Sequence, residues 1–261
     1  MNMTDKAVLI TGSSKGMGFA IAKEFAINHA KICIVARNKE NLFSAKQSIL
    51  KDCPNADIIT VPGDVGEEEI PEKVFNICIK EFGKIDILVN NTGGPPAGSF
   101  LEHNESVWKL AINQNLMSAI RFCTLVAPIM KQNNWGRIIN ILSTVAKEPS
   151  SAMVLSATTR SGLSAFTKAI AFELAPYQIT VNSILPGGVL TDRLYSLLSK
   201  GEQDTEDLES KIKESAKMIP IQRHAAPKEI ADVVLFLASN KASYITGLNI
   251  PIDGGLTKGI F

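Results

Sequence analysis

Short apolar runs alternate with helix-length segments along almost the whole chain, and this rhythm constrains the fold more than any other feature. Most of the runs are rich in β-branched residues and too short for helices; they span 7–10, 32–35, 58–61, 85–89, 137–141, 179–184 and 249–252. Helical spacing marks the segments between them, for example 18–30, 156–174 and 228–238. Such runs are typical of strands buried on both faces. The alternation predicts an α/β fold with a doubly wound, seven-stranded, mostly parallel sheet and helices on both faces.

The rhythm also predicts one domain over residues 1–261. No Pro/Ser-rich linker divides the chain, and 45% apolar residues are enough for a sizeable core. Residues 191–220 are the exception, because they are polar and charged between two well-patterned blocks. We expect them to form a helical excursion that covers a pocket.

Charge and cysteine usage exclude several functions. Lys and Arg number 27 against 26 Asp and Glu, so no basic surface for nucleic acid is expected. No apolar run approaches the roughly 20 residues that span a bilayer, and residues 1–6 lack a signal-peptide pattern. We therefore expect a cytoplasmic protein without a membrane partner. The four cysteines show no metal-ligand spacing, so we expect reduced thiols and no metal.

The first predicted strand leads into a glycine-rich turn and then into a helix. The turn reads TGSSKGMG, which spaces Gly12, Gly16 and Gly18 as GxxxGxG. Glycines allow a tight turn and let the backbone approach a pyrophosphate at the helix N-terminus. A purely structural turn is the alternative, but the place between strand and helix is the one this chemistry requires. We predict a Rossmann-type dinucleotide site here. Its other loop residues are Ser14, Lys15 and Met17.

A basic residue follows the second predicted strand, where NAD-binding domains usually carry an acid. Residues 34–38 read IVARN and offer no Asp or Glu to the adenosine ribose. Arg37 instead provides a planar guanidinium suited to a 2′-phosphate, and Lys15 adds charge nearby. The alternative is that both are solvated surface charges. The pattern favours NADP(H) over NAD(H) as the cofactor.

Two further strand ends supply candidate cofactor contacts. Asp64 and Val65 follow the third strand, where a carboxylate can accept a hydrogen bond from the adenine amino group. Asn91 and Gly93 lie in the small-residue sequence NNTGG after the fourth strand. Because ligands of open α/β sheets bind at the carboxyl ends of the strands, we predict that these residues line the cofactor site.

The combined motifs resemble the short-chain dehydrogenase/reductase family over nearly the whole chain. The matching blocks are TGSSKGMG, DILVNNTGG (with Thr92 in place of Ala), GRIINILS, ITVNSILPGGVLT, the R-x-x-x-P-x-E-I segment at 223–230 and YITGLNIPIDGG. They are most similar to members resembling 3-oxoacyl-[acyl-carrier-protein] reductases. The resemblance implies further cofactor contacts from Pro186, Gly187, Val189 and Thr191.

The resemblance also implies a catalytic set of Asn, Ser, Tyr and Lys, and here the sequence departs from it. Asn115 and Ser143 match the Asn and the Ser. Ser156 stands at the Tyr position and Arg160 at the Lys position, four residues apart on one helical face. Asn113 lies two residues from Asn115, and only the alignment favours Asn115.

This departure changes the proton chemistry that the family uses. An aliphatic hydroxyl is a much weaker acid than a phenol of pKa about 10, and a serine reaches less far. Arg160 can hold the nicotinamide ribose but cannot relay a proton as a lysine can. The proton donor then is Ser156, a water or Tyr195, with His103 as another candidate; for Tyr195 and His103 a packed or solvated side chain is the alternative.

We therefore expect an NADP(H)-dependent oxidoreductase with an atypical active site that acts on a small-molecule carbonyl/alcohol pair. The alternative is a catalytically weak or inactive NADP(H)-binding sensor or partner subunit. The residues do not identify the substrate. Family resemblance further implies a homodimer or homotetramer that pairs through the helices near 108–131 and 156–174.

Overall fold

The computed structural model describes residues 1–199 and 205–260 and contains the predicted parallel sheet. All the strand pairs are parallel, in the order β3-β2-β1-β4-β5-β6-β7. The strands are β1 (Ala7–Thr11), β2 (Lys31–Ala36), β3 (Asp57–Pro62), β4 (Ile87–Asn90), β5 (Gly136–Ile141), β6 (Ile179–Pro186) and β7 (Asn249–Ile252). The predicted fold class is confirmed, and the strand order reverses direction between β1 and β4, where doubly wound folds bind their ligands.

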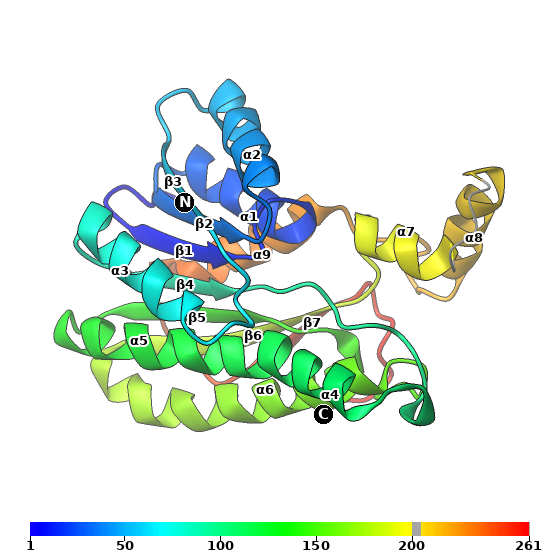
Figure 1. Cartoon of the computed structure of the whole chain (residues 1–261). Coiled ribbons are helices and arrows are strands. Elements are labelled where there is room, and N and C mark those ends of the chain that lie inside the picture. The colour runs from blue at the N-terminus through cyan, green and yellow to red at the C-terminus, as the bar shows by residue number, and fades with distance from the viewer. Residues whose placement is uncertain (200–204, 261) are drawn as a thin grey trace.

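Helices cover both faces of the sheet (Figure 1). One face is packed by α1 (Gly16–Ile27), α2 (Lys39–Asp52) and α9 (Pro227–Ala238). The other is packed by α3 (Ile70–Phe82), α5 (Ser118–Gln132) and α6 (Val154–Leu174). Phe25 and Phe122, both fully buried, lie in the two apolar clusters that result. The central strands, such as β1 and β4, are buried on both faces, which explains why their sequences are mostly apolar.

The remaining helices lie toward the carboxyl ends of the strands. α4 (Glu105–Ile112) runs through a π-helical turn, Asn113–Met117, into α5. α7 (Asp192–Ser199) and α8 (Thr205–Lys217) project from the main body (Figure 1). Short 3₁₀ turns are η1 (Phe100–Glu102), η3 (Thr144–Ala146), η4 (Ala175–Tyr177) and η5 (Asn240–Ala242). Residues 200–204 of the predicted excursion lie outside the described residues.

Several boundaries differ from the sequence prediction by one to three residues, and two of these differences have local causes. The first helix ends at Ile27 rather than at residue 30, because His29 adopts a left-handed backbone with φ 66°. The fourth strand begins at Ile87 rather than at residue 85. The Asp86 carboxylate accepts a 2.9 Å hydrogen bond from the Ala7 amide and lies 2.9 Å from the Lys84 ammonium. These contacts hold the segment that directly precedes β4.

A buried polar chain fixes α6 against the sheet. Asn90 of β4 donates to Asn140 of β5 at 2.8 Å, and Asn140 donates to Thr167 of α6 at 2.8 Å. The Thr167 hydroxyl is 2.9 Å from that of Ser183 in β6. Buried hydrogen bonds of this kind specify one packing arrangement. These hydrogen bonds therefore help to position two α6 residues further toward its N-terminus: Arg160, two turns before Thr167, and Ser156, three turns before it.

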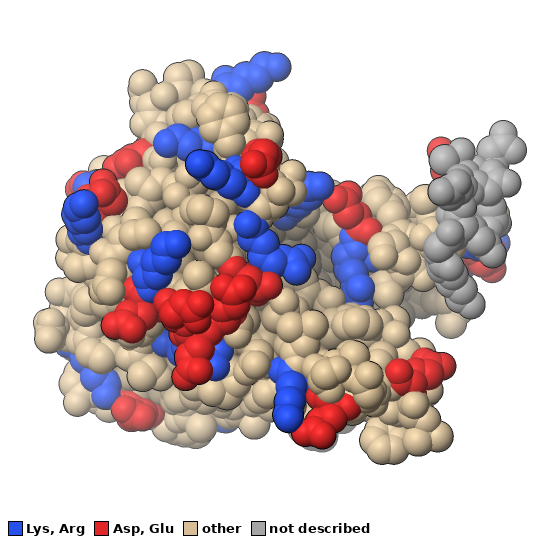
Figure 2. All heavy atoms as spheres, in the orientation of Figure 1, with Lys and Arg blue, Asp and Glu red and all other residues tan. Residues whose placement is uncertain are grey.

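Within residues 1–199 and 205–260, no helix combines the length and the apolar character needed to cross a membrane. In the same part of the chain, His, Cys, Asp and Glu side chains form no cluster suited to a metal ion. The cysteines are free thiols. Figure 2 shows acidic and basic side chains interspersed on one face of the molecule.

Candidate functional site

The loops after β1 and β4 are locked together at the carboxyl edge of the sheet. The Thr11 hydroxyl donates to the Asn91 carbonyl at 2.9 Å, and the Asn91 side-chain amide donates to the Gly12 carbonyl at 2.9 Å. Asn91 is therefore occupied in holding the glycine loop in place. Ser13, which sequence reasoning missed, adds a second tie: its buried hydroxyl donates to Ile10 and accepts from the Val35 amide.

The three glycines of the loop have different local roles. A Cβ on Gly12 or Gly18 would collide with backbone, with the Asn91 carbonyl for Gly12 and the Gly12 carbonyl for Gly18. Gly12 also has φ +56°, which other residues rarely adopt. Gly16 faces more open space, since its Cβ would lie 3.3 Å from the Thr191 methyl group. Close packing thus explains Gly12 and Gly18. A Cβ on Gly16 would meet only the Thr191 side chain, and one on Gly93 would meet nothing within 4 Å, so these two positions leave room for a ligand.

The N-terminus of α1 offers backbone donors to an anion. Its N-cap residue, Lys15, makes no side-chain capping bond, so the first amides of the helix keep their donors available. The Lys15 ammonium is exposed and lies 3.8 Å from the Asp192 carboxylate. Ser14 and Met17 are partly buried in the same turn. An uncapped helix N-terminus beside a lysine fits the pyrophosphate of a dinucleotide.

The predicted adenosine end carries a weakly held arginine. Arg37 is 75% exposed at its side chain and lies 3.9 Å from the Asp64 carboxylate. Asp64 itself accepts from the Gly66 amide at 3.0 Å and from the Gln114 side chain at 3.3 Å. Val65 is buried beside it. Arg37 can therefore turn to a 2′-phosphate, whereas Asp64 is partly satisfied by Gln114, a residue that the sequence analysis did not single out.

The loop after β6 reaches across to the glycine loop. The Gly187 amide donates to the Ile252 carbonyl at 3.0 Å, and Pro186 is buried in β6. Val189 pairs with Ala225, and Thr191 then contacts Gly16. The resemblance assigns the residues of this loop to the cofactor. These contacts place them at the same edge of the sheet as the glycine loop.

The buried side chain of His224 packs against the loop after β6. A Cβ on Gly188 would collide with the His224 ring, which is 7% exposed. The opposite ring nitrogen, Nε2, lies 2.9 Å from the Ser215 hydroxyl of α8. His224 therefore connects the loop after β6 to the projecting helices.

Asn115 and Ser143 occupy the ends of α4 and β5. Asn115 lies in the π-helical turn and is 3% exposed; its side chain donates to the Ala111 carbonyl at 3.3 Å and accepts from Thr92 at 3.1 Å. Ser143 caps η3 by accepting from the Val145 amide at 3.4 Å. Because the Ser143 oxygen accepts in this contact, its hydroxyl hydrogen remains able to donate to a ligand.

Ser156 and Arg160 form a buried pair on α6. The Arg160 Nε donates to the Ser156 Oγ at 3.1 Å, and its Nη1 donates to the carbonyls of Ile141 (3.0 Å) and Leu142. Burial, with a smaller contribution from the nearby charge of Arg193, lowers the pKa of Arg160 to about 10. Arg160 therefore stays protonated at neutral pH. Its guanidinium lies against the residue that directly precedes Ser143.

Arg193, on the first turn of α7, joins the site without having been predicted. Its Nη2 donates to the Pro95 carbonyl at 2.6 Å. A Cβ on Gly94 would lie 3.1 Å from its guanidinium, so the glycine makes room for it. Arg193 is the one arginine within residues 191–220, and this was the available signal in the sequence. Figure 2 shows Lys and Arg side chains around the hollow between the main body and the projecting helices.

The other two candidate proton donors, Tyr195 and His103, are not hydrogen-bonded to the Ser156–Arg160 pair within the described residues. Tyr195 is 37% exposed on α7, and its amide bonds to Thr191. His103 follows η1, and its Nε2 is buried with no hydrogen-bond partner among residues 1–199 and 205–260. In that described part of the chain, neither side chain bonds to Ser143 or Ser156.

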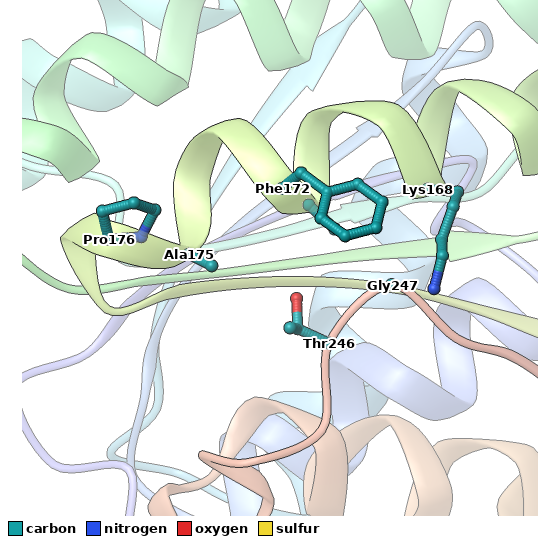
Figure 3. Close-up of a pocket in the computed structure, with 7 residues that line it drawn as sticks. Lys168, Phe172, Ala175, Pro176, Thr246 and Gly247 are labelled. Carbon is teal, nitrogen blue, oxygen red and sulfur yellow. The ribbon is translucent and has the colours of Figure 1, made fainter.

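A small apolar pocket of about 220 Å³ lies elsewhere, at the C-terminal end of α6 (Figure 3). Lys168 and Phe172 of α6 border it, and Thr246 and Gly247 from the segment before β7 lie opposite. Phe172 is 73% exposed. None of the predicted site residues lines this pocket.

Comparisons with known proteins show which family the chain resembles over its length. A family model described as enoyl-(acyl carrier protein) reductase matches residues 12–257. The NADPH-dependent reductase BacG of Bacillus subtilis is 34% identical over 259 residues, covering 99% of this chain and 100% of BacG. The 3-oxoacyl-[acyl-carrier-protein] reductase FabG of Chlamydia muridarum is 35% identical, with 97% of this chain and 98% of FabG covered.

Solved structures share the fold over the same length. L-sorbose reductase from Gluconobacter frateurii, complexed with NADPH and L-sorbose, is 32% identical with a TM-score of 0.93. The match covers 100% of this chain and 99% of that one. Both the family match and the full-length relatives confirm the resemblance that the motifs indicate. The chain belongs to the short-chain dehydrogenase/reductase family.

Proposed function

We propose that this protein is an NADPH-dependent oxidoreductase that interconverts a small-molecule carbonyl and its alcohol, with Ser156 and Arg160 in place of the family's Tyr and Lys. The observation that carries the proposal is the Ser156–Arg160 pair, which is bound to the end of β5 next to Ser143. The pair therefore lies at the edge where the cofactor loops converge.

The cofactor is NADP(H). BacG and L-sorbose reductase are NADPH-dependent or bind NADPH, which confirms the preference predicted from Lys15 and Arg37. In the proposed arrangement the α1 amides hold the pyrophosphate, and Arg37 binds the 2′-phosphate. Arg160 donates to the nicotinamide ribose. Bound NADPH supplies the hydride for the reduction.

Ser143 and Asn115 orient the carbonyl in this proposal. The free hydroxyl hydrogen of Ser143 donates to the substrate oxygen and fixes it near the site of hydride transfer. Asn115, held by Ala111 and Thr92, keeps the π-helical turn in position and orders water beside it. Both act by positioning, which requires no titratable group.

The proton reaches the carbonyl oxygen from Ser156 or from a water that it binds. The charged Arg160 donates to the Ser156 oxygen and so polarises its hydroxyl, which makes that hydrogen a better donor. Tyr195 on α7 is the alternative donor. Because a general acid contributes typically 10²–10⁴-fold, replacing the phenol predicts a slow enzyme rather than an inactive one.

Residues 191–220 are proposed to cover the substrate. The contact that supports this is Arg193 of α7, which bonds to Pro95 after β4 and thereby ties the start of the excursion to the site.

The test is NADPH consumption with a broad panel of ketones and aldehydes, combined with direct measurement of NADPH binding. We expect slow turnover that Ser143→Ala reduces by on the order of 100-fold without weakening NADPH binding. Ser150→Ala, at an exposed serine in the following loop, is the matched control and should match the wild type. Tight NADPH binding without turnover would instead support a non-catalytic sensor or partner subunit.

A further inference from the structure

Two guanidinium groups lie at the substrate end of the candidate site without a carboxylate to balance them. Arg160 is 7% exposed and Arg193 is half-buried. Within the described ranges, 1–199 and 205–260, neither arginine forms an ion pair with Asp or Glu. Arg137, another buried arginine, differs because it stacks on the Trp135 ring at 4.4 Å.

The hydrogen bonds of the two arginines satisfy donors but do not neutralise charge. Their acceptors are the carbonyls of Ile141, Leu142 and Pro95 and the Ser156 hydroxyl, all of them neutral groups. A buried charge without an opposite charge is costly, so such a pair points to an anion that completes the site. Donors remain for it. In the described part of the chain, Arg160 Nη2 and Arg193 Nε and Nη1 make no hydrogen bond.

The location of the pair separates it from the predicted phosphate contacts. Lys15 and Arg37 follow β1 and β2, whereas Arg160 is bound to the end of β5 and Arg193 to the loop after β4. The sheet order places β4 and β5 on the opposite side of β1 from β2. The two arginines are therefore not required for the 2′-phosphate. Arg160 is bound to Leu142, which directly precedes Ser143, and Arg193 is close enough for its charge to lower the pKa of Arg160.

We propose that the substrate is a small oxo acid whose carboxylate binds between Arg160 and Arg193 while its ketone lies at Ser143. This proposal rests on the proposed function and names its substrate class. Arg160 Nη2 and Arg193 Nε and Nη1 are charged donors for the carboxylate oxygens, and charge-assisted hydrogen bonds are strong. In the reaction, hydride from NADPH adds to the ketone carbon and a proton adds to its oxygen. The carboxylate is unchanged and serves only for binding.

The test compares each acid with its uncharged ester in the full-length protein. The probes are 2-, 4- and 5-oxohexanoate and their methyl esters, which differ in the spacing between ketone and carboxylate. We expect at least one acid to have a kcat/KM on the order of 10- to 100-fold above that of its ester, as the loss of a charged hydrogen bond predicts.

Arg193→Gln tests the residue itself. The variant should raise KM for the acid by about the same factor, lower the ester's kcat/KM by a clearly smaller factor, and leave the Kd of NADPH unchanged. Arg193→Lys, which keeps the charge, should restore part of the preference for the acid. Arg223→Gln is the matched control, because that arginine is exposed and paired with Glu229; it should keep the wild-type kcat and KM and the wild-type Kd of NADPH.

The outcomes separate this inference from the proposed function. If esters and neutral ketones are reduced as well as the acids, the function stands and the inference fails. If Arg193→Gln weakens NADPH binding and lowers activity on acid and ester equally, Arg193 serves the cofactor and the inference fails. If NADPH binds but no carbonyl is reduced, the proposed function fails. Calorimetric binding of the three oxohexanoates to the NADP⁺ complex then decides whether the carboxylate site exists. Binding that Arg193→Gln removes supports the carboxylate site, and absence of binding overturns it.

Discussion

The Nε of Arg160 donates a 3.1 Å hydrogen bond to the Oγ of Ser156, one turn earlier on the same buried helix face. Each residue explains the other's local environment. The serine satisfies a guanidinium donor that would otherwise be buried without a partner, and the arginine polarises the serine hydroxyl. The two residues that we propose for the family's Tyr and Lys positions thus form one interacting unit.

Removing the serine hydroxyl should therefore affect stability and catalysis together. Ser156→Ala leaves the Arg160 Nε buried without an acceptor, which costs about 1–3 kcal/mol of unfolding free energy. If Ser156 supplies the proton, kcat should also fall while the Kd of NADPH stays constant. Urea unfolding and steady-state kinetics measure the two effects. Ser156→Thr keeps a hydroxyl and should recover part of kcat; a Ser156→Ala variant with unchanged kcat would leave a water or Tyr195 as the donor.

Arg37 should determine the choice between NADPH and NADH. Arg37→Gln removes the guanidinium that we assign to the 2′-phosphate, so the Kd of NADPH should rise on the order of 10- to 100-fold. The Kd of NADH, which lacks that phosphate, should not change. Lys51→Gln, at the other end of α2, is the control for removing one exposed positive charge. Equal losses for both cofactors would contradict the assignment. Fluorescence titration of the reduced nicotinamide measures the Kd of each cofactor for the wild type and for both variants.

The start of α9 should make unfolding sensitive to acid. Both Arg223 Nη atoms donate to the Glu229 carboxylate at 2.7 Å, and these bonds, with one from the Ala226 amide, lower the pKa of Glu229 to about 2. A lowered carboxyl pKa stabilises the fold above the ordinary value of 4.5, and this contribution is lost as the pH falls toward 2. Glu229→Gln should therefore lower the urea midpoint at pH 6.

At pH 2 to 3 the wild type and Glu229→Gln should converge, because the wild-type carboxyl then becomes protonated as well. Added salt should shrink the difference at pH 6, since the pair is exposed. A difference in urea midpoint that is the same at both pH values would show that Glu229 acts without its charge.

We also propose self-association through the α5 and α6 faces, as the family resemblance implies. Phe172 of α6 is 73% exposed beside the apolar pocket of Figure 3, so it is a large apolar side chain available for burial. Phe172→Glu should lower the mass measured by light scattering toward that of the monomer. Phe43→Glu, at an exposed aromatic on α2 across the sheet, should leave it unchanged. A wild-type monomer would refute the proposal.

The sequence was sufficient to predict the sheet because its signals are local. Most strands contain a short apolar run, and the glycine turn lies between the first strand and the first helix. The boundary errors have local causes as well. The first helix ends early because His29 has a left-handed backbone, and β4 begins after Asp86, whose side chain is hydrogen-bonded to Ala7. Apolar periodicity reports neither backbone angles nor individual hydrogen bonds.

The site was less predictable because its contacts join distant segments. Arg160 and Arg193 come from different helices, and only the fold places their charges near each other. The π-helical turn that holds Asn115 shifts the hydrogen-bond register of one helix, which residue pattern alone does not indicate. Nor does a glycine motif reveal that Asn91 holds the loop in place, since that requires the loops after β1 and β4 to be in contact.

The most direct measurement of the central claim is transfer of deuterium from NADPH labelled at the nicotinamide C4 position into a carbonyl substrate. Wild-type protein should yield the deuterated alcohol, and Ser143→Ala should form it on the order of 100-fold more slowly while binding NADPH equally well. Saturating NADPH binding with no deuterated product from any carbonyl tested would contradict the claim that this chain is an oxidoreductase.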